Sequence, residues 1–294
     1  HPHGPFAAGT MTVPEQPLSR PLRIAVVTQE DPFYIGHFFR RFLSLLESGS
    51  DIVDLRGVIV QPSLGSGSTR ELAARVWSLY GSAGFVRMAA RYALARLRST
   101  GIARQCRRAG IPVLAFPAEF SIDSRSGEER RDRPARVNNI NGRSAAAWIS
   151  GEDLDLLVSV SASQIFGPRT LALPRYGCIN LHNAPLPHYR GMLPNFWQMF
   201  HGEGESVLTV HTMVPRLDDG EILMRHATPI RPGTSLEQLM TETKAASAEA
   251  LMTVLQRIHD ATIHPEPMRG DGSYFTWPQR AEAREFRRRG YRVW

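Results

Sequence analysis

The chain alternates short apolar runs with longer segments of helical periodicity, and this alternation limits the folds that it can adopt. Residues 22–28 (LRIAVVT) and 55–61 (LRGVIVQ) are apolar and rich in β-branched side chains. Such runs are typical of strands that are buried on both faces. The segment before the second run repeats apolar residues at helical spacing (HFFRRFLSLLES). Strand, helix and strand in this order predict a parallel sheet with helices on its faces.

The rest of the chain continues this pattern and adds an antiparallel pair. Buried strands are predicted within 111–116, 154–166 and 177–187, and two neighbouring antiparallel strands at 207–215 and 220–230. Residues 234–260 predict a helix that Thr234 or Ser235 caps. We therefore expect an α/β fold, with a Rossmann-like, mostly parallel sheet, helices on both of its faces and a short C-terminal extension.

Composition narrows the class of protein. The chain is 42% hydrophobic and 21% charged, as in globular proteins, and it lacks the ~20 consecutive apolar residues of a membrane span. Two cysteines, Cys106 and Cys178, make a disulfide framework improbable, and neither has a second ligand at zinc spacing. We expect a cytoplasmic protein without a metal site. The first residues lack the order of a secretion signal, so residues 1–20 are interpreted as a tag or disordered segment.

The charge balance leaves several partners open. The net charge is +7, which favours polyanionic partners such as nucleic acid, anionic lipid or phosphate-bearing small molecules, or else reflects a genome that encodes arginine freely. A Gly/Ser loop at 62–69 leads into a long, Arg-rich helical segment at 70–100. That helix could dock on the core, form the face of a homodimer or, least expected, lie on an anionic membrane.

Polar residues at the ends of strands carry the chemistry. The strand that ends at Leu181 delivers Asn180 and His182, which point to the same side because they are two positions apart. Asp218 lies in a turn between the two later strands and could orient the His182 ring and stabilise its protonated form. We interpret Asp219 as a surface turn residue and His188, His201 and His211 as structural or exposed.

These residues carry a resemblance to a known family. The segment CINLHNAPLPHYRG, followed about thirty residues later by LDDGEIL, resembles the signature of the folate-dependent formyltransferases, which join an Asn-x-His motif to a later Leu-Asp-x-Gly. VSVSASQIFGP and the tail SYFTWPQRAEAREFRRRG also resemble segments of that family. The chain departs from the pattern at Asn183, where the family often has Ala or Pro, and at residues 184–187. The likeness implies a catalytic domain at 21–262 and a C-terminal extension at 263–294.

The resemblance implies formyl transfer from 10-formyltetrahydrofolate to an amine. Asn180 would donate to the oxygen that becomes negative, His182 would help to protonate the departing folate nitrogen, and Asp218 would hold His182 and accept the amine's proton. The folate pterin is expected against two segments, and the acceptor against two further side chains. The folate segments are Gln164, Ile165 and Phe166, with Pro215 and Arg216, and the acceptor contacts are Asn183 and Arg190, although Arg190 could equally be a surface residue.

The acceptor is expected to be a small molecule. The tRNA enzyme of this family carries a nucleic-acid-binding domain after its catalytic domain, whereas only about thirty residues follow the helix that ends near 260, too few for a barrel of five strands of ~5 residues each. We therefore expect an amino-sugar nucleotide, an amino acid or a specialised metabolite, with tRNA and membrane partners disfavoured. The alternatives are an enzyme like the methionyl-tRNA formyltransferases and a non-catalytic folate-binding module.

Overall fold

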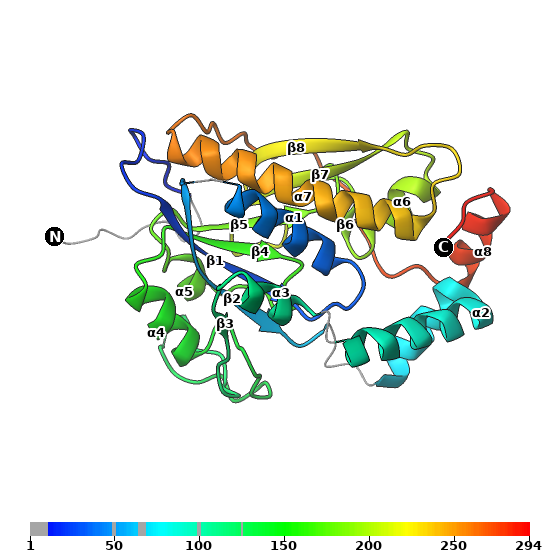
Figure 1. Ribbon diagram of the computed structural model, residues 1–294, viewed down its shortest axis with the longest axis horizontal. Helices are drawn as coiled ribbons and strands as arrows, with labels where there is room; N and C mark the ends of the chain where they lie inside the picture. Colours follow the sequence, from blue (N-terminus) through cyan, green and yellow to red (C-terminus); the bar gives the residue numbers. More distant parts are fainter. Residues whose placement is uncertain (1–10, 49–50, 64–68, 99–100, 125) are drawn as a thin grey trace.

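The protein is built on a seven-stranded sheet in which the expected α/β pattern is confirmed (Figure 1). The computed structural model describes residues 11–48, 51–63, 69–98, 101–124 and 126–294. The strands follow the order β3-β2-β1-β4-β5-β7-β8. The first five are parallel, and β7 and β8 are antiparallel. They span β1 (Leu22–Gln29), β2 (Val53–Gln61), β3 (Val113–Leu114), β4 (Leu156–Val160), β5 (Cys178–His182), β7 (Glu205–Thr212) and β8 (Ile222–Pro229).

Helices cover both faces of the sheet, because its central strands are apolar on both sides. One hydrophobic cluster joins the sheet to α1 (Ile35–Glu47), α3 (Ile102–Arg108) and α7 (Leu236–His259). The other joins it to α4 (Arg143–Gly151) and α5 (Pro168–Leu171). Figure 1 shows α1 and α7 on one side of the strands and α4 and α5 on the other.

The observed ends of elements refine the predicted ones. Ser235 caps α7 by accepting a hydrogen bond from the Gln238 backbone, and the Gln238 side chain bonds back to the Ser235 backbone. These two reciprocal hydrogen bonds identify Ser235, and not Thr234, as the residue that caps the helix. The strand predicted at 154–166 ends at Val160, because Ser161 takes a left-handed backbone conformation at φ 54°.

A third hydrophobic cluster forms a lobe beside the sheet. It joins α2 (Thr69–Arg98), α6 (Pro194–Phe200), α8 (Arg280–Arg288) and the start of α7. A two-stranded sheet of β6 (Arg190–Gly191) and β9 (Tyr274–Phe275) lies next to it. The expected C-terminal extension therefore packs closely on the domain, with Ala283 and Phe286 of α8 fully buried.

The Arg-rich helix α2 docks on the core, the first of the three alternatives. Its Leu79, Tyr80 and Met88 are buried. Arg87 and Arg91 both form ion pairs with Glu237 in the first turn of α7, so these two charges link α2 to α7. The helix kinks at Gly81, whose φ of 69° is left-handed. The Gly/Ser loop that precedes α2 lies outside the described residues at 64–68.

Part of the segment assigned to a disordered tail packs on the domain instead. Met11 is buried, and the Leu18 backbone N–H donates to the His259 carbonyl at 2.8 Å. Residues 1–10 lie outside the described residues. In the part of the chain that the structure describes, no helix combines the length and the apolar character that crossing a membrane requires.

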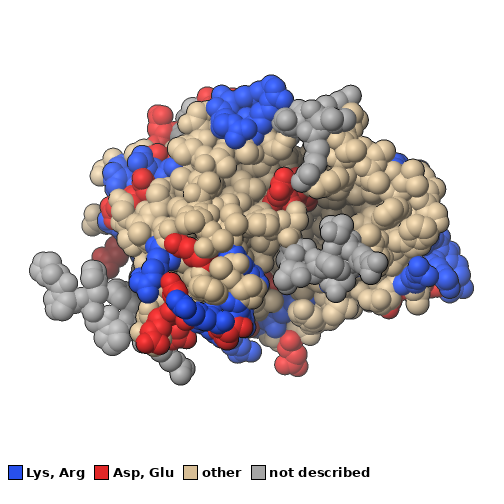
Figure 2. Space-filling model, turned by 90° about the horizontal axis from the view of Figure 1, so that it is seen from below, with Lys and Arg blue, Asp and Glu red and all other residues tan. Residues whose placement is uncertain are grey.

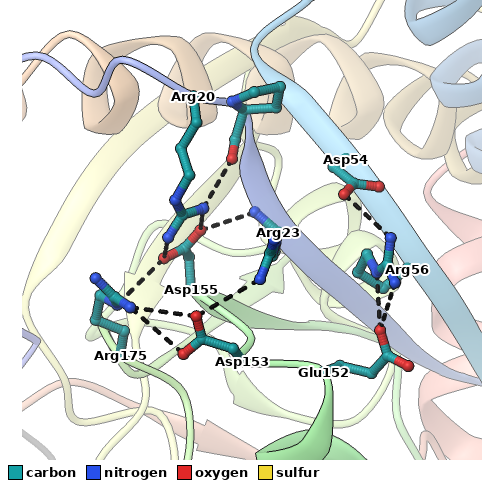
Figure 3. A network of polar contacts seen from close by, with 9 residues as sticks. Arg20, Arg23, Asp54, Arg56, Glu152, Asp153, Asp155 and Arg175 are labelled. Atoms are coloured by element: carbon teal, nitrogen blue, oxygen red, sulfur yellow. Dashed lines mark hydrogen bonds and ion pairs between the residues drawn. The ribbon is translucent and has the colours of Figure 1, made fainter.

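The buried carboxylate of Asp155, directly before β4, binds Arg20 and Arg23 at the start of the domain and lies near Arg175 (Figure 3). The Asp155 side chain has no exposed surface, and it accepts two hydrogen bonds from the Arg20 guanidinium at 2.6 and 2.9 Å. It also accepts one from the Arg23 backbone N–H at 2.8 Å, and Arg175 lies 3.6 Å away. The neighbouring Asp153 binds Arg23 and Arg175 at the surface, where ion pairs contribute little.

This difference in burial gives a stability test. Asp155→Ala should lower the free energy of unfolding by about 2–3 kcal/mol, because the Arg23 backbone N–H loses its acceptor and the half-buried Arg20 guanidinium loses its partner. Asp153→Asn, which removes an exposed charge beside Arg23 and Arg175 and suits the left-handed φ of 48° at this position, should cost under ~1 kcal/mol. Urea unfolding of both variants measures the difference, and equal costs would contradict the assigned anchoring role.

Candidate active site

Asn180 and His182 lie on one face of β5, as their spacing predicts. Cys178, Asn180 and His182 alternate with Ile179 and Leu181, which belong to the core cluster beneath α1 and α7. Cys178 belongs to the opposite cluster, beneath α4 and α5. The amide and the imidazole therefore occupy the face of the sheet that α5 covers.

The Asn180 side chain is held by a histidine on the neighbouring strand. Asn180 pairs with His211 of β7 in the antiparallel ladder. His211 Nδ1 lies 2.8 Å from the Thr212 carbonyl oxygen, which can only accept, so Nδ1 carries the proton. In the neutral ring Nε2 is then an acceptor, and the Asn180 amide donates to it at 3.1 Å. One Asn180 N–H is used in this way, and the second has no acceptor among the residues that the structure describes.

The electrostatics agree with a neutral His211 ring. The side chain is only 2% exposed, and burial lowers the pKa of His211 to about 4, although Asp218 partly opposes this shift. A neutral imidazole keeps its Nε2 lone pair. The hydrogen bond that orients Asn180 is therefore stable at neutral pH.

Asp218 reaches the same place from the connection between β7 and β8. Because β7 runs antiparallel to β5, this connection leaves the sheet near the amino end of β5 and returns along its face. Asp218 Oδ1 lies 3.7 Å from His211 Nε2, and Oδ2 lies 4.0 Å from His182 Nδ1. The structure thus brings together the three residues of the predicted constellation, with His211 as a fourth member.

His182 is oriented toward the carboxylate. Its Nε2 lies 3.3 Å from the Tyr189 carbonyl oxygen and donates to it, so Nδ1 faces Asp218. At 4.0 Å the two groups do not share a direct hydrogen bond. A proton on Nδ1 would nevertheless face the negative charge, which suits an imidazole that takes up and releases a proton. His182 is 13% exposed, compared with 7% for Asp218.

The turn that carries Asp218 is fixed by a close approach of two backbones. A Cβ at Gly220 would lie 1.8 Å from the Thr212 carbonyl oxygen, so no other residue fits there. Asp218 itself has a left-handed φ of 49°. Arg190 donates to the Asp218 carbonyl oxygen at 3.1 Å and to the Asp219 carboxylate at 3.0 Å. Asp219 thus lies in the turn, as predicted, but it is half-buried and pairs with Arg190.

The predicted acceptor contacts occupy different surroundings. Arg190 is committed to the turn described above, and its role toward a ligand stays a prediction. Asn183 is buried, its amide donates to Asn195 and Thr243, and Ser247 donates to its oxygen. Both residues support the frame of the site in this structure.

The predicted folate segments leave the sheet at opposite ends of β5. In the loop after β4, Gln164 accepts from the Ile140 backbone and Phe166 is buried, whereas the Ile165 side chain is 67% exposed. Pro215 and Arg216 are exposed in the connection after β7, and Arg216 pairs with Asp219 at 3.2 Å. No structural contact tests their assignment to folate, which stays a prediction.

Sequence reasoning missed His211, which it grouped with His188 and His201. The signal that could have found it is the alternation of VLTVHTMVP, which places His211 on a strand seven residues before Asp218. The pairing of β7 with β5 was the missing step. Two surface grooves, one lined by Arg231 and Tyr291 and one by Trp77 and Arg284, contain none of these residues. The candidate site is therefore located by the convergence of its polar side chains and not by either groove.

The depressed pKa of His211 predicts acid sensitivity. As the pH falls from 6.5 to about 4, His211 becomes protonated in the unfolded chain but stays neutral in the folded protein. The free energy of unfolding should therefore decrease as the pH is lowered through this window. The slope from this residue should approach ~1.4 kcal/mol per pH unit. Urea unfolding at several pH values should show a shallower slope in His211→Gln than in the parent. An unchanged slope would contradict a neutral, buried ring.

The turn glycine predicts a second difference in stability. Gly220→Ala should cost about 2–4 kcal/mol or displace the Asp218 turn, because the new Cβ overlaps the Thr212 backbone. Gly204→Ala is the matched control, since a Cβ there meets open space, and it should stay within ~0.5 kcal/mol. Thermal unfolding compares the two, and similar values would refute the close approach.

Solved structures with a similar fold are formyl-group transferases. Glycinamide ribonucleotide transformylase 1 from Symbiobacterium toebii matches with a TM-score of 0.55 at 17% identity, over 86% of this chain and 96% of its own. A sugar N-formyltransferase from Shewanella sp. FDAARGOS_354 matches with a TM-score of 0.52 at 16% identity, over 87% of this chain and 76% of its own. At these identities the likeness concerns the fold.

Sequence comparison gives the family. A methionyl-tRNA formyltransferase of Citrifermentans bemidjiense is 31% identical over 157 residues, which are 50% of this chain and 49% of the relative. That of Sorangium cellulosum is 33% identical over 122 residues, 42% of this chain and 39% of the relative. The chain thus spans about half the length, or less, of these curated relatives. The sequence model described as "Formyl transferase" matches residues 100–255, more than half of the chain. The chain therefore belongs to the formyl transferase family.

Proposed function

We propose that this protein transfers the formyl group of 10-formyltetrahydrofolate to the primary amine of a small molecule. The observation that carries the proposal is the convergence of Asn180, His182 and Asp218 on one face of β5, with His211 holding the amide. Formyl transfer is acyl transfer to nitrogen, and this set can stabilise a developing negative charge and move protons.

Asn180 would stabilise the formyl oxygen. As an amine attacks the formyl carbon, negative charge develops on that oxygen, and a donor that is already oriented lowers the barrier. Because His211 accepts one Asn180 N–H, the amide plane is fixed before a ligand binds. The second N–H then needs no reorientation, and such a contact contributes about 3–4 kcal/mol.

His182 and Asp218 would transfer the protons that the reaction moves between the amine and the folate nitrogen. The attacking nitrogen must lose a proton, and the departing folate nitrogen must gain one. His182 Nδ1 faces the Asp218 carboxylate at 4.0 Å, so the two groups that would exchange protons with the substrates lie side by side. The same carboxylate can accept the amine's proton directly or through water.

The surroundings fit a folate. 10-Formyltetrahydrofolate would supply the formyl group and the leaving nitrogen. The loop after β4 presents the exposed, apolar Ile165 side chain, while Phe166 and the Gln164 hydrogen bond to Ile140 hold the loop in place. A fixed loop with an apolar surface suits a flat aromatic ring. We therefore retain Gln164, Ile165 and Phe166, with Pro215 and Arg216, as the proposed folate contacts.

tRNA is the second candidate acceptor. The curated relatives named above are methionyl-tRNA formyltransferases, which counts against the expectation that tRNA is disfavoured. The matched stretch nevertheless covers 49% and 39% of them, so about half or more of each relative has no counterpart in the match. We favour the small amine because the two solved structures named above, a glycinamide ribonucleotide transformylase and a sugar N-formyltransferase, share the fold over 86% and 87% of this chain.

Substitutions at the site test the chemistry. Asn180→Ala should lower kcat about 10²–10³-fold and His182→Ala about 10²–10⁴-fold, because each removes an interaction of the transition state. Tetrahydrofolate release from 10-formyltetrahydrofolate measures both. His259→Ala is the control, since its ring binds Asp260 at the far end of α7, and it should retain full activity.

The acceptor decides between the two candidates. Wild-type protein should release tetrahydrofolate with members of a panel of amino sugars, nucleotide-linked amino sugars and amino acids, and should leave methionyl-tRNA unformylated. Turnover with methionyl-tRNA alone would favour the second candidate. Folate binding without turnover on any acceptor would favour a non-catalytic module.

A further inference from the structure

The second half of α2 exposes a face of the kind that proteins usually cover. Residues 82–94 include two charged side chains, Arg87 and Arg91, and both bind Glu237 of α7. A surface helix normally turns its charges toward water and its apolar residues toward the core. Here the exposed residues, which we call the α2 face, are Ser82, Ala83, Val86, Ala89, Ala90, Tyr92, Ala93 and Leu94.

Large apolar side chains are concentrated around the α2 face. The part of the chain that the structure describes exposes nine such side chains, and five of them lie on α2 or pack beside it. Val86 is 67% exposed, and the guanidinium of Arg87 lies 5.0 Å from the centre of the Trp294 ring. Single exposed apolar residues are ordinary, whereas a group of them indicates a surface that binds something. The five are Trp77, Val86, Tyr92, Leu94 and Trp294.

Arginines without an acidic partner lie next to this face. Arg288 and Arg289 of α8 share Glu285, but Arg280 and Arg284 pair with no carboxylate among the described residues. Like charges that gather without a carboxylate repel one another, and an anionic partner relieves that repulsion. The groove between the two helices is lined by Trp77, Ser78 and Gly81 of α2 and by Arg280, Arg284 and Arg287 of α8.

The α2 face and the arginines of α8 adjoin at the kink of α2. Gly81 lines the groove, and Ser82 begins the exposed face. Figure 2 looks at the molecule from below, the side on which α2 lies in Figure 1. The right-hand part of this view is mainly uncharged, and basic side chains gather at its right edge, at the end of the molecule that carries α8. One broad partner can therefore contact both features.

We propose that the α2 face and the arginines of α8 form a docking surface for an anionic phospholipid membrane. The exposed apolar side chains would enter the boundary between head groups and acyl chains, with Trp77 and Trp294 at the level of the head groups. Arg280 and Arg284 would bind lipid phosphates. The contacts that hold α2 on the domain use its other side, through Leu79 and Met88, so docking on a membrane leaves them in place.

Two other partners fit this surface less well. A second copy of the chain would form an isologous interface, which brings two copies of the same arginine group together. A nucleic acid would neutralise Arg280 and Arg284, but its interfaces are polar and strongly charged, and they would cover Val86 and Leu94 with a phosphate backbone. A membrane of anionic lipid satisfies the apolar and the basic parts together.

Vesicle flotation of the full chain tests the surface. Vesicles of phosphatidylcholine with ~30% phosphatidylglycerol should carry the protein upward in a density gradient, and vesicles of phosphatidylcholine alone should bind it about tenfold or more weakly. Sodium chloride at ~0.5 M should weaken the binding, because salt screens the attraction to lipid phosphates.

A charge on the α2 face tests the apolar contact. Val86→Asp should lower the vesicle partition coefficient about tenfold or more, because the carboxylate cannot enter the apolar boundary and is repelled by anionic lipid. Val137→Asp is the matched control, since Val137 is also exposed, at 49%, but lies outside α2 and α8. Circular dichroism melting of both variants verifies that they are folded.

Loss of the arginines tests the electrostatic contact. The double variant Arg280→Gln with Arg284→Gln should lower the partition coefficient about 10–30-fold, since each arginine at an anionic surface contributes about fivefold. Arg40→Gln with Arg257→Gln removes the same charge from exposed positions of α1 and α7, and it should change the coefficient less than about threefold.

The outcomes distinguish the possible partners. Folded wild-type protein that ignores anionic vesicles would overturn the proposal, and so would vesicle binding that both sets of substitutions leave unchanged. A lipid-independent dimer that Val86→Asp dissociates in sedimentation, without vesicle binding, would assign the face to a second copy. Oligonucleotide binding that only the arginine substitutions weaken, again without vesicle binding, would assign it to nucleic acid. None of these measurements needs turnover, so the result is independent of the proposed formyl transfer.

Discussion

The hydrogen bond that Asn180 donates to His211 determines how the rest of the site is arranged. It requires a neutral ring, and burial on β7 provides one. It also requires β7 to lie directly beside β5, which the antiparallel ladder provides. With the amide fixed, Asp218 can lie between two imidazoles without taking up the second Asn180 N–H, which the proposed reaction uses. Preorganisation of this kind spares the cost of reorienting dipoles during the reaction.

The central part of the fold follows from patterns that are local in the sequence. The runs that became β1 and β2 are mostly apolar, and the stripe of α7 repeats every three to four residues, so period and burial alone predict them. The edge strand β3 is only two residues long, and β4 ends at Val160, directly before Ser161. These ends depend on neighbouring strands and on a left-handed residue, which no local period reveals.

The site was predicted in part for a similar reason. Asn180 and His182 share a strand face because of their spacing, and the motif they form supplied the link to Asp218. The pairing of Asn180 with His211 is a contact across thirty-one residues that depends on strand order. Arg190 illustrates the converse: its charge suggested a ligand contact, but the nearest carboxylate in the folded chain is Asp219 of the same site. The sequence thus indicates which kinds of side chain belong to the site more readily than it indicates which residues they contact.

The reversed direction of β7 has a consequence for how this protein can diversify. Because β5 and β7 are adjacent and antiparallel, all four polar side chains of the site come from two neighbouring strands and one connection, at residues 178–221. The opposite half of the sheet, with β1, β2 and the α2 lobe, contributes none of them. Insertions or exchanges in that half can therefore occur without moving the amide, the imidazoles or the carboxylate. The two halves of one sheet can thereby vary separately.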